Sequence, residues 1–352
     1  MIKKLLVLAL SMIMLTNLAA CGDDNGDVNV SKEETDASSE TEYIYVHTNF
    51  NWGIENQDNV YVNTYGVTND CLIGIKSEIN MESGEQTQAI LKYNIVNGTL
   101  ESVPYVSESP SEFIKFVSMK PDGALVACAE DYQPNEETGE VELQYRVLFI
   151  DAAGQISDII DLSEICAEIE GKYDSTDIRS FAVDSDQTIY LTFEKEIVAL
   201  KSNGKKLFSI ESDNMFQSVG NTSNGDVYAV YFGQSGIEIS MIDRKAEDFG
   251  AKYELSNYDI SGSFELAEDG ILYFNDGNAI YKADLKTGDS EEILQWLDEG
   301  IDSQLVMNVE YIDENTFFVH NYNPTTNEEG YVKLVKTDKE LLKDKSGQGI
   351  IY

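Results

Sequence analysis

The sequence predicts an all-β fold, a β-propeller built from four-stranded blades. The first observation is a repeated unit, in which a short apolar strand, a turn of Asp, Asn or Gly, and a second apolar strand occur six times. The second observation is spacing: the turns recur every 38 to 64 residues, and a period near 40 to 50 is typical of propeller blades. Six blades are favoured and seven are the alternative. An irregular β-sandwich with similar hairpins is the competing interpretation.

Turn chemistry predicts the first two strands of each blade. Asp122-Gly123 and Asp269-Gly270 lie between apolar runs. Such dipeptides favour hairpins because the turn requires a positive φ, which glycine tolerates. The same pattern predicts six hairpins, at residues 61–72, 116–126, 181–191, 219–228, 264–273 and 309–318.

A third strand is expected after each hairpin, from a further run of β-branched and aromatic residues. These runs cover residues 89–93, 146–150, 197–200, 237–241, 279–282 and 332–335. A weaker fourth strand follows a polar turn and is clearest at 204–210. The last blade has no obvious fourth strand, so residues 43–47 are expected to supply it and to close the ring.

In two segments between blades, the spacing of apolar residues changes from every second residue, typical of a strand, towards the roughly 3.6-residue period of a helix. The two segments are residues 162–173 and 290–301. In the second, apolar side chains including Ile293, Leu297 and Ile301 share one face of a helix, and acidic residues stand at its start. We therefore expect short amphipathic helices between blades.

The N-terminus predicts export and lipidation. A basic start at Lys3 and Lys4 precedes an apolar run that ends in Leu-Ala-Ala-Cys21, as in a secretory signal. This ending resembles the bacterial lipobox, which implies that residues 1–20 are removed and that the Cys21 thiol is diacylated. Two acyl chains anchor a protein stably. The expected location is extracytoplasmic, at the cell membrane; an ordinary secretion signal is the alternative.

Composition then divides the rest of the chain. Residues 21–42 are acidic and polar with almost no large apolar side chain, which is typical of a disordered tether. Residues 43–338 contain the predicted propeller. Residues 339–352 are a C-terminal tail or the start of a further domain.

Charge and cysteine content exclude some classes. The chain has 64 acidic and 24 basic residues, a net charge of −40, which repels nucleic acid. Beyond Cys21, the residues Cys71, Cys128 and Cys166 show no metal-binding spacing. Cys71 and Cys128 lie in strand-like apolar runs, so buried thiols are the default interpretation for these two. One disulfide among the three is the alternative, with the pair left open.

No catalytic motif appears in the sequence. The two histidines, His47 and His320, have no nucleophile motif nearby and are expected to be structural. No metal ligands, cofactor or catalytic residue are predicted. Paired carboxylates for glycoside hydrolysis remain an alternative, because 64 acids offer too many candidates to choose among.

The candidate ligand site follows from the expected topology. If every hairpin turn lies on one face of the disc, the longest and least regular segments lie on the other, and irregular loops commonly carry binding residues. The residues selected there are Tyr132, Phe232, His320 and Tyr322. Aromatic rings on loops suit a sugar, a peptide or a protein partner.

Residues 181–191 followed by 198–205 resemble blades of NHL/TolB-type propellers, which mainly serve binding. The lipobox, acidic tether, Tyr43-Ile44-Tyr45-Val46 strand and Gln295-Trp296-Leu297-Asp298 resemble the N-terminal part of clostridial extracellular solute-binding lipoproteins. That resemblance implies a link to ABC-type solute uptake and carries over no site residue. The expected function is a non-catalytic binding module, and an extracellular carbohydrate-active hydrolase or lyase is the alternative.

Overall fold

The structure is a computed structural model. It describes residues 43–50, 52, 59–68, 70–82, 85–107, 109, 111–120, 124–134, 141–151, 153–173, 175–222, 225–233, 236–256, 264–267, 270–276, 279–295, 305–313, 315–323 and 328–338. The predicted signal peptide, the lipidation site Cys21, the tether and the C-terminal segment 339–352 lie outside these residues.

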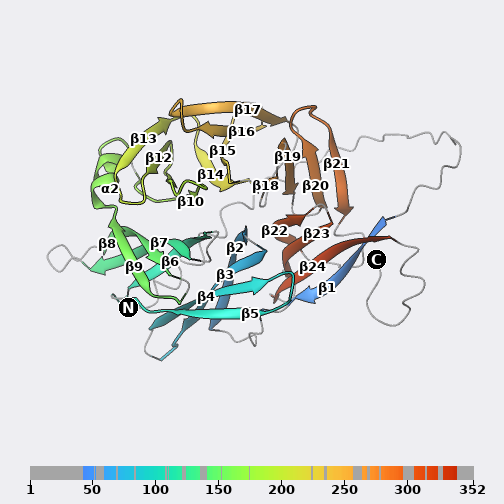
Figure 1. The fold of residues 1–352 in the computed structure, drawn as a ribbon, viewed down its shortest axis with the longest axis horizontal. Coiled ribbons are helices and arrows are strands. Elements are labelled where there is room, and N and C mark those ends of the chain that lie inside the picture. Colours follow the sequence, from blue (N-terminus) through green and yellow to red (C-terminus); the bar gives the residue numbers. More distant parts are fainter. Residues whose placement is uncertain are drawn as a thin grey trace, which may run out of the picture.

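Six antiparallel sheets of four strands are arranged around a common centre (Figure 1). Blade 1 consists of β2 (Val60–Thr68), β3 (Cys71–Ile79), β4 (Gln86–Asn94) and β5 (Leu100–Tyr105), and blade 2 of β6 (Glu112–Met119), β7 (Leu125–Pro134), β8 (Val141–Ile150) and β9 (Ile156–Asp161). Blade 3 consists of β10 (Ser180–Val183), β11 (Ile189–Thr192), β12 (Glu196–Leu200) and β13 (Lys206–Glu211), and blade 4 of β14 (Phe216–Asn221), β15 (Val227–Phe232), β16 (Gly236–Asp243) and β17 (Asp248–Ser256). Blade 5 consists of β18 (Phe264–Leu266), β19 (Ile271–Asn275), β20 (Ala279–Asp284) and β21 (Ser290–Gln295), and blade 6 of β22 (Leu305–Asp313), β23 (Thr316–Asn323), β24 (Glu328–Asp338) and β1 (Tyr43–Phe50).

The predicted ring closure is confirmed. β1 pairs antiparallel with β24, in a register that joins Tyr43 to Asp338 and Phe50 to Tyr331. The first strand of the described chain is therefore the fourth strand of the last blade. The described strands form six blades rather than seven, and they form no sandwich.

A hydrophobic cluster fills each of the six seams between neighbouring blades. Alternation along each strand explains this arrangement, because successive side chains point to opposite faces of a sheet. In β7, Val126 and Cys128 enter the seam with blade 3, whereas Leu125 and Ala127 enter the seam with blade 1. The middle strands are thus apolar on both faces. Cys128 is fully buried, as expected, whereas Cys71 at the start of β3 is only partly buried.

One predicted helix is confirmed and the other is wrong. Helix α2 (Ser163–Glu170) lies between blades 2 and 3 and buries Ile169. Residues 290–295, by contrast, form strand β21, paired with β20. A β-bulge in this pairing lets the consecutive residues Ile293 and Leu294 both pack in the seam between blades 5 and 6, so their spacing imitates a helix. Residues 296–301 of that prediction lie outside the described residues.

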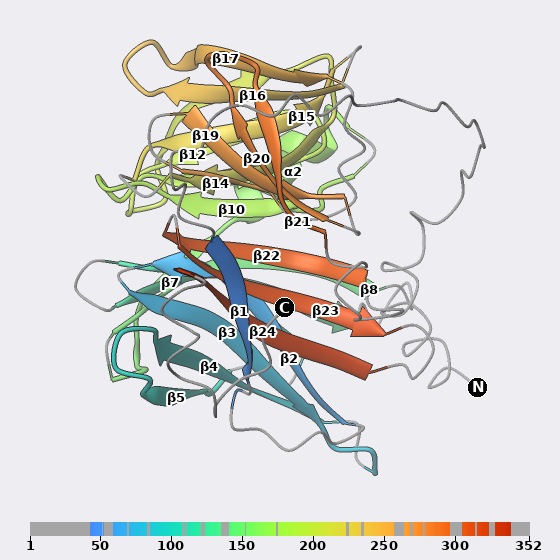
Figure 2. The ribbon, with the colours of Figure 1, turned by 90° about the vertical axis from the view of Figure 1, so that its right-hand side faces the viewer.

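The strands run between two faces of the disc, which Figure 2 presents from the side. We call one the turn face: it carries the hairpins from first to second strands and from third to fourth strands. The other, the loop face, carries the connections from second to third strands and those between blades. Tyr43 and Asp338 both lie at the turn face. None of the helices in the described ranges is long and apolar enough to span a membrane.

Candidate functional site

Exposed apolar side chains gather at the loop face. Ten large apolar residues are exposed among those the structure describes, and seven belong to strand ends or connections of this face. They are Tyr61, Met81, Val106, Tyr132, Val141, Met215 and Phe232. The other three are Val96 and Leu100 at the turn face and Ile159 on an outer strand. Because irregular connections commonly carry binding residues, the loop face is the candidate surface for contacts with other molecules.

The four residues selected from the sequence all lie on second strands, near the loop face. Tyr132 in β7 is 42% exposed and Phe232 in β15 is 51% exposed. His320 in β23 stacks on Tyr331, with ring centroids 4.6 Å apart, and so is packed rather than presented. The backbone of Tyr322 lies in β23, and its side chain is outside the described part. These residues belong to blades 2, 4 and 6, so they do not form one contiguous cluster.

Tyr132 belongs to a charged cluster in the seam between blades 2 and 3, which we call the Lys115 cluster: Lys115, Glu130, Tyr132, Tyr145 and Asp177. The Lys115 Nζ lies 3.2 Å from Glu130 Oε2 and 2.6 Å from Asp177 Oδ1. The Tyr132 hydroxyl donates to Glu130 Oε1 at 3.0 Å, and the Tyr145 hydroxyl donates to Asp177 Oδ1 at 2.7 Å. Strands β6, β7 and β8 and the segment after α2 thus meet at one point.

The electrostatics of the Lys115 cluster keep its lysine and its two tyrosines protonated. Burial alone lowers the pKa of the Lys115 ammonium, but Glu130 and Asp177 outweigh this effect and raise that pKa above its ordinary value. Burial and the nearby carboxylates also raise the pKa of Tyr132 and of Tyr145. Lys115 therefore stays charged and both hydroxyls stay protonated at neutral pH. The cluster contains donors and fixed charges but no activated nucleophile.

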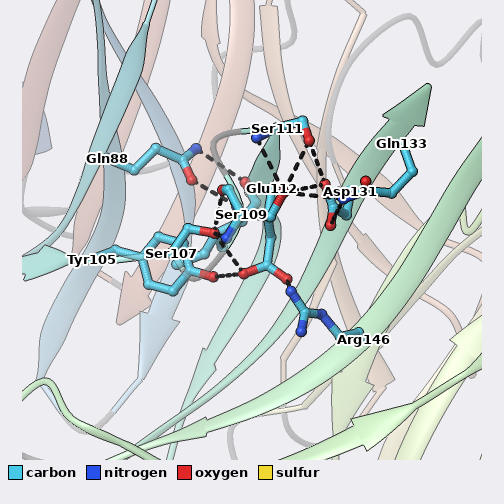
Figure 3. Close-up of polar contacts among 10 residues, drawn as sticks. Gln88, Tyr105, Ser107, Ser109, Ser111, Glu112, Asp131, Gln133 and Arg146 are labelled. Carbon is cyan, nitrogen blue, oxygen red and sulfur yellow. Dashed lines mark hydrogen bonds and ion pairs between the residues drawn. The ribbon is translucent and has the colours of Figure 1, made fainter. Parts of the chain in front are cut away.

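A second polar network occupies the seam between blades 1 and 2 (Figure 3). The buried Glu112 carboxylate accepts hydrogen bonds from the Tyr105 hydroxyl at 2.5 Å and from Ser107 Oγ at 2.9 Å, and it forms an ion pair with Arg146. Gln88 lies beside it and binds the backbone of Ile114 through both ends of its amide. Each charge of this network is compensated by a partner within the protein.

Asp131 continues the network towards the loop face (Figure 3). Its Oδ1 accepts from Ser109 Oγ at 3.0 Å and from Ser111 Oγ at 2.7 Å, and its Oδ2 accepts from Gln133 Nε2 at 2.6 Å. These bonds fix the connection between β5 and β6, which carries the exposed Val106. The alternating serines 107, 109 and 111 are the sequence signal for this network, and the sequence analysis missed it. We interpret the network as support for the loop face.

A partly buried acid with a shifted pKa lies on β18, the first, innermost strand of blade 5, close to the first strand of blade 6. Glu265 in β18 accepts a hydrogen bond from the Tyr311 backbone N–H at 2.7 Å. Burial, and then the neighbouring charge of Glu310 in β22, raise the pKa of Glu265 well above its ordinary value. Sequence reasoning could not single out this residue, because nothing local distinguishes it from the other acids.

Metal binding finds no support in the described residues. They contain no group of three or more His, Cys, Asp or Glu side chains arranged to hold a metal ion.

Comparisons with known proteins identify no family. No protein-family model matches the chain, and no curated protein sequence matches it. Solved structures with similar folds include a luciferin-regenerating enzyme, at 11% identity and a TM-score of 0.48, covering 83% of this chain and 95% of that one. A gluconolactonase from Xanthomonas campestris matches at 12% identity and a TM-score of 0.45, covering 80% and 96%. The β-propeller domain of the Trilobed protease from Pyrococcus furiosus matches at 12% identity and a TM-score of 0.42, covering 80% and 95%. Scores at this level carry no argument about function, and the propeller assignment stands on the strand pairing.

Proposed function

We propose that this chain is the non-catalytic binding module of an extracytoplasmic lipoprotein, anchored to the cell membrane through Cys21. The observation that carries the proposal is the concentration of exposed apolar side chains at the loop face, where seven of the ten described examples lie. Tyr132 and Phe232 supply rigid aromatic contact area, and the surrounding irregular connections supply polar groups. A glycan, a peptide or a protein partner suits this surface.

The state of the polar groups near this face agrees with binding. Lys115 and Arg146 are engaged by carboxylates of the protein. The hydroxyls of Tyr132 and Tyr145 are held protonated. A loop face of this kind orients a ligand by contact and hydrogen bonding rather than by chemistry at an activated group.

The resemblance of the tether, first strand and propeller to clostridial extracellular solute-binding lipoproteins belongs to the same proposal. It implies a role beside ABC-type solute uptake. In that role the propeller would hold a partner or a solute-bearing polymer near the membrane, and transport itself would be carried out by other components.

The test is a panel of cell-wall fragments, glycans and peptides, read both for binding and for turnover. Saturable binding without turnover, weakened by Tyr132→Ala and Phe232→Ala, is expected. The matched control is Val96→Ala with Leu100→Ala, which removes exposed apolar groups from the turn face. Equal effects of both pairs, or binding by no member of the panel, would overturn the proposal.

One observation favours the alternative of a surface carbohydrate-active enzyme. Glu265 is an acid that holds its proton more tightly than an ordinary glutamate, and Glu310 is a second carboxylate in its neighbourhood. A glycosidase requires an acid and a carboxylate of this kind. Turnover of a glycan in the same panel, abolished by Glu265→Gln in a variant with unchanged melting behaviour, would support the enzyme over the binding module.

A further inference from the structure

The charge of the molecule is unevenly divided between its two faces. Among the described residues, the connections of the loop face contain nine acidic and three basic residues, a net charge of −6. The described connections of the turn face contain seven acidic and six basic residues, a net charge of −1. The three bases at the loop face are Lys172, Arg179 and Lys195. The face that exposes most of the apolar side chains is therefore also the more acidic one.

Several cations near the loop face are neutralised inside the protein. Lys172 Nζ lies 2.8 Å from Glu196 Oε2 and 3.0 Å from Glu211 Oε1. Lys115 and Arg146 are held by the carboxylates already described. These cations already form ion pairs with carboxylates of the protein. An anionic ligand would therefore be repelled by the net negative charge of the loop face.

Acidic residues also stand exposed in the connections that carry the apolar side chains. Glu82 and Glu85 are exposed beside Met81 in the connection between β3 and β4. Carboxylates around apolar contact residues attract a positively charged partner, speed its encounter and fix its register, while the apolar groups provide the buried area. A neutral glycan would gain nothing from this field.

We propose that the loop face docks a cationic polypeptide, a segment rich in lysine or arginine that also carries apolar side chains. The inference rests on the proposed binding function and specifies the partner. The net negative charge of the loop face favours a cationic partner. A polypeptide fits best because the described apolar residues are distributed over several blades, and an extended chain can reach more than one of them. The partner approaches from the side opposite Tyr43 and Asp338.

The probe is a short synthetic peptide of alternating lysine and leucine with one tryptophan, compared with peptides in which glutamate or serine replaces each lysine. Binding to the full chain is measured by fluorescence anisotropy over a range of salt concentrations. We expect saturable binding of the lysine peptide only, weakening as the ionic strength rises past about 0.15 M, because salt screens exposed charges.

Matched charge variants localise the effect. Glu82→Gln with Glu85→Gln removes two exposed charges from the loop face, and Glu101→Gln with Glu247→Gln removes two from the turn face. The loop-face pair should weaken binding about threefold to tenfold and the turn-face pair less than twofold, in variants with unchanged thermal unfolding.

Equal effects of the two pairs would show a non-specific attraction to the acidic protein and overturn the inference, as would equal binding of all three peptides. A different set of outcomes tests the proposed binding function. If glycans bind in a way that depends on Tyr132 and Phe232 while the lysine peptide does not bind, the binding function stands and the cationic partner is wrong. If no probe binds, both are wrong.

Discussion

The seam that closes the ring can be tested with Phe318→Ala. Phe318 in β23 is 3% exposed, and its ring centroid lies 5.0 Å from that of Phe50 in β1 and 6.1 Å from that of Tyr93 in blade 1. Truncating a buried phenylalanine costs about 3–5 kcal/mol. At about 2 °C per kcal/mol for a domain of this size, the melting temperature should fall by roughly 6–10 °C. Calorimetry measures this change.

Phe318→Ala should also change the local stability of one strand, β1. Losing the contact with Phe50 should loosen β1 selectively, so its amides should exchange hydrogen at least about tenfold faster, the equivalent of about 1.4 kcal/mol. The control is Phe274→Ala, which removes an equally buried ring from the seam between blades 4 and 5. Hydrogen exchange followed by mass spectrometry compares the two variants. Equal protection of β1 in both would refute the idea that Phe318 secures the closing strand.

Two further predictions concern Glu265 and Cys21. Burial, and then Glu310, raise the pKa of Glu265, so its contribution to stability is complete below the unfolded-state pKa and is lost as pH rises through the folded-state pKa. Glu265→Gln should therefore flatten the decline in urea midpoint as the pH rises above about 4.5, and an unchanged slope would contradict the assignment. Cys21→Ala should release the protein from the membrane fraction, because two acyl chains provide the anchor. A variant that stays membrane-bound and still incorporates labelled lipid would disprove lipidation at this residue.

The propeller could be predicted because its signals are local. Three of the six hairpin turns contain Asp-Gly or Asn-Gly, and the other three contain Asp or Asn. Together with the apolar strands on either side, these turns specify each hairpin within about ten residues. The closing strand, predicted at residues 43–47 and found at Tyr43–Phe50, could be inferred from an unpaired last blade. The segment at 290–295 was mistaken for a helix because a β-bulge that places two neighbouring apolar residues in one seam leaves no mark in the sequence.

The candidate site was only partly predictable, because burial and distant pairing define it. Tyr132 and Phe232 were selected from loop position, and the structure leaves both exposed. The cluster to which Tyr132 belongs was not foreseen, since Lys115 and Asp177, which form an ion pair in it, are 62 positions apart in the chain. His320 was selected for its residue type, but stacking on Tyr331 occupies its ring. Side-chain environment is a tertiary property, and strand periodicity does not report it.

The pairing of β1 with β24 also determines how the domain would respond to mechanical force. β1 enters at the turn face and runs towards the loop face, paired over eight residues with its neighbour. Tension between an anchor before Tyr43 and a partner held at the loop face would act along the strand, so all eight residue pairs would share the load in shear. Tension between Tyr43 and a segment following Asp338 would instead act on that first pair alone and separate the strands one pair at a time. The same closure would thus resist a pull from a bound partner and yield to a pull applied between the two ends of the domain.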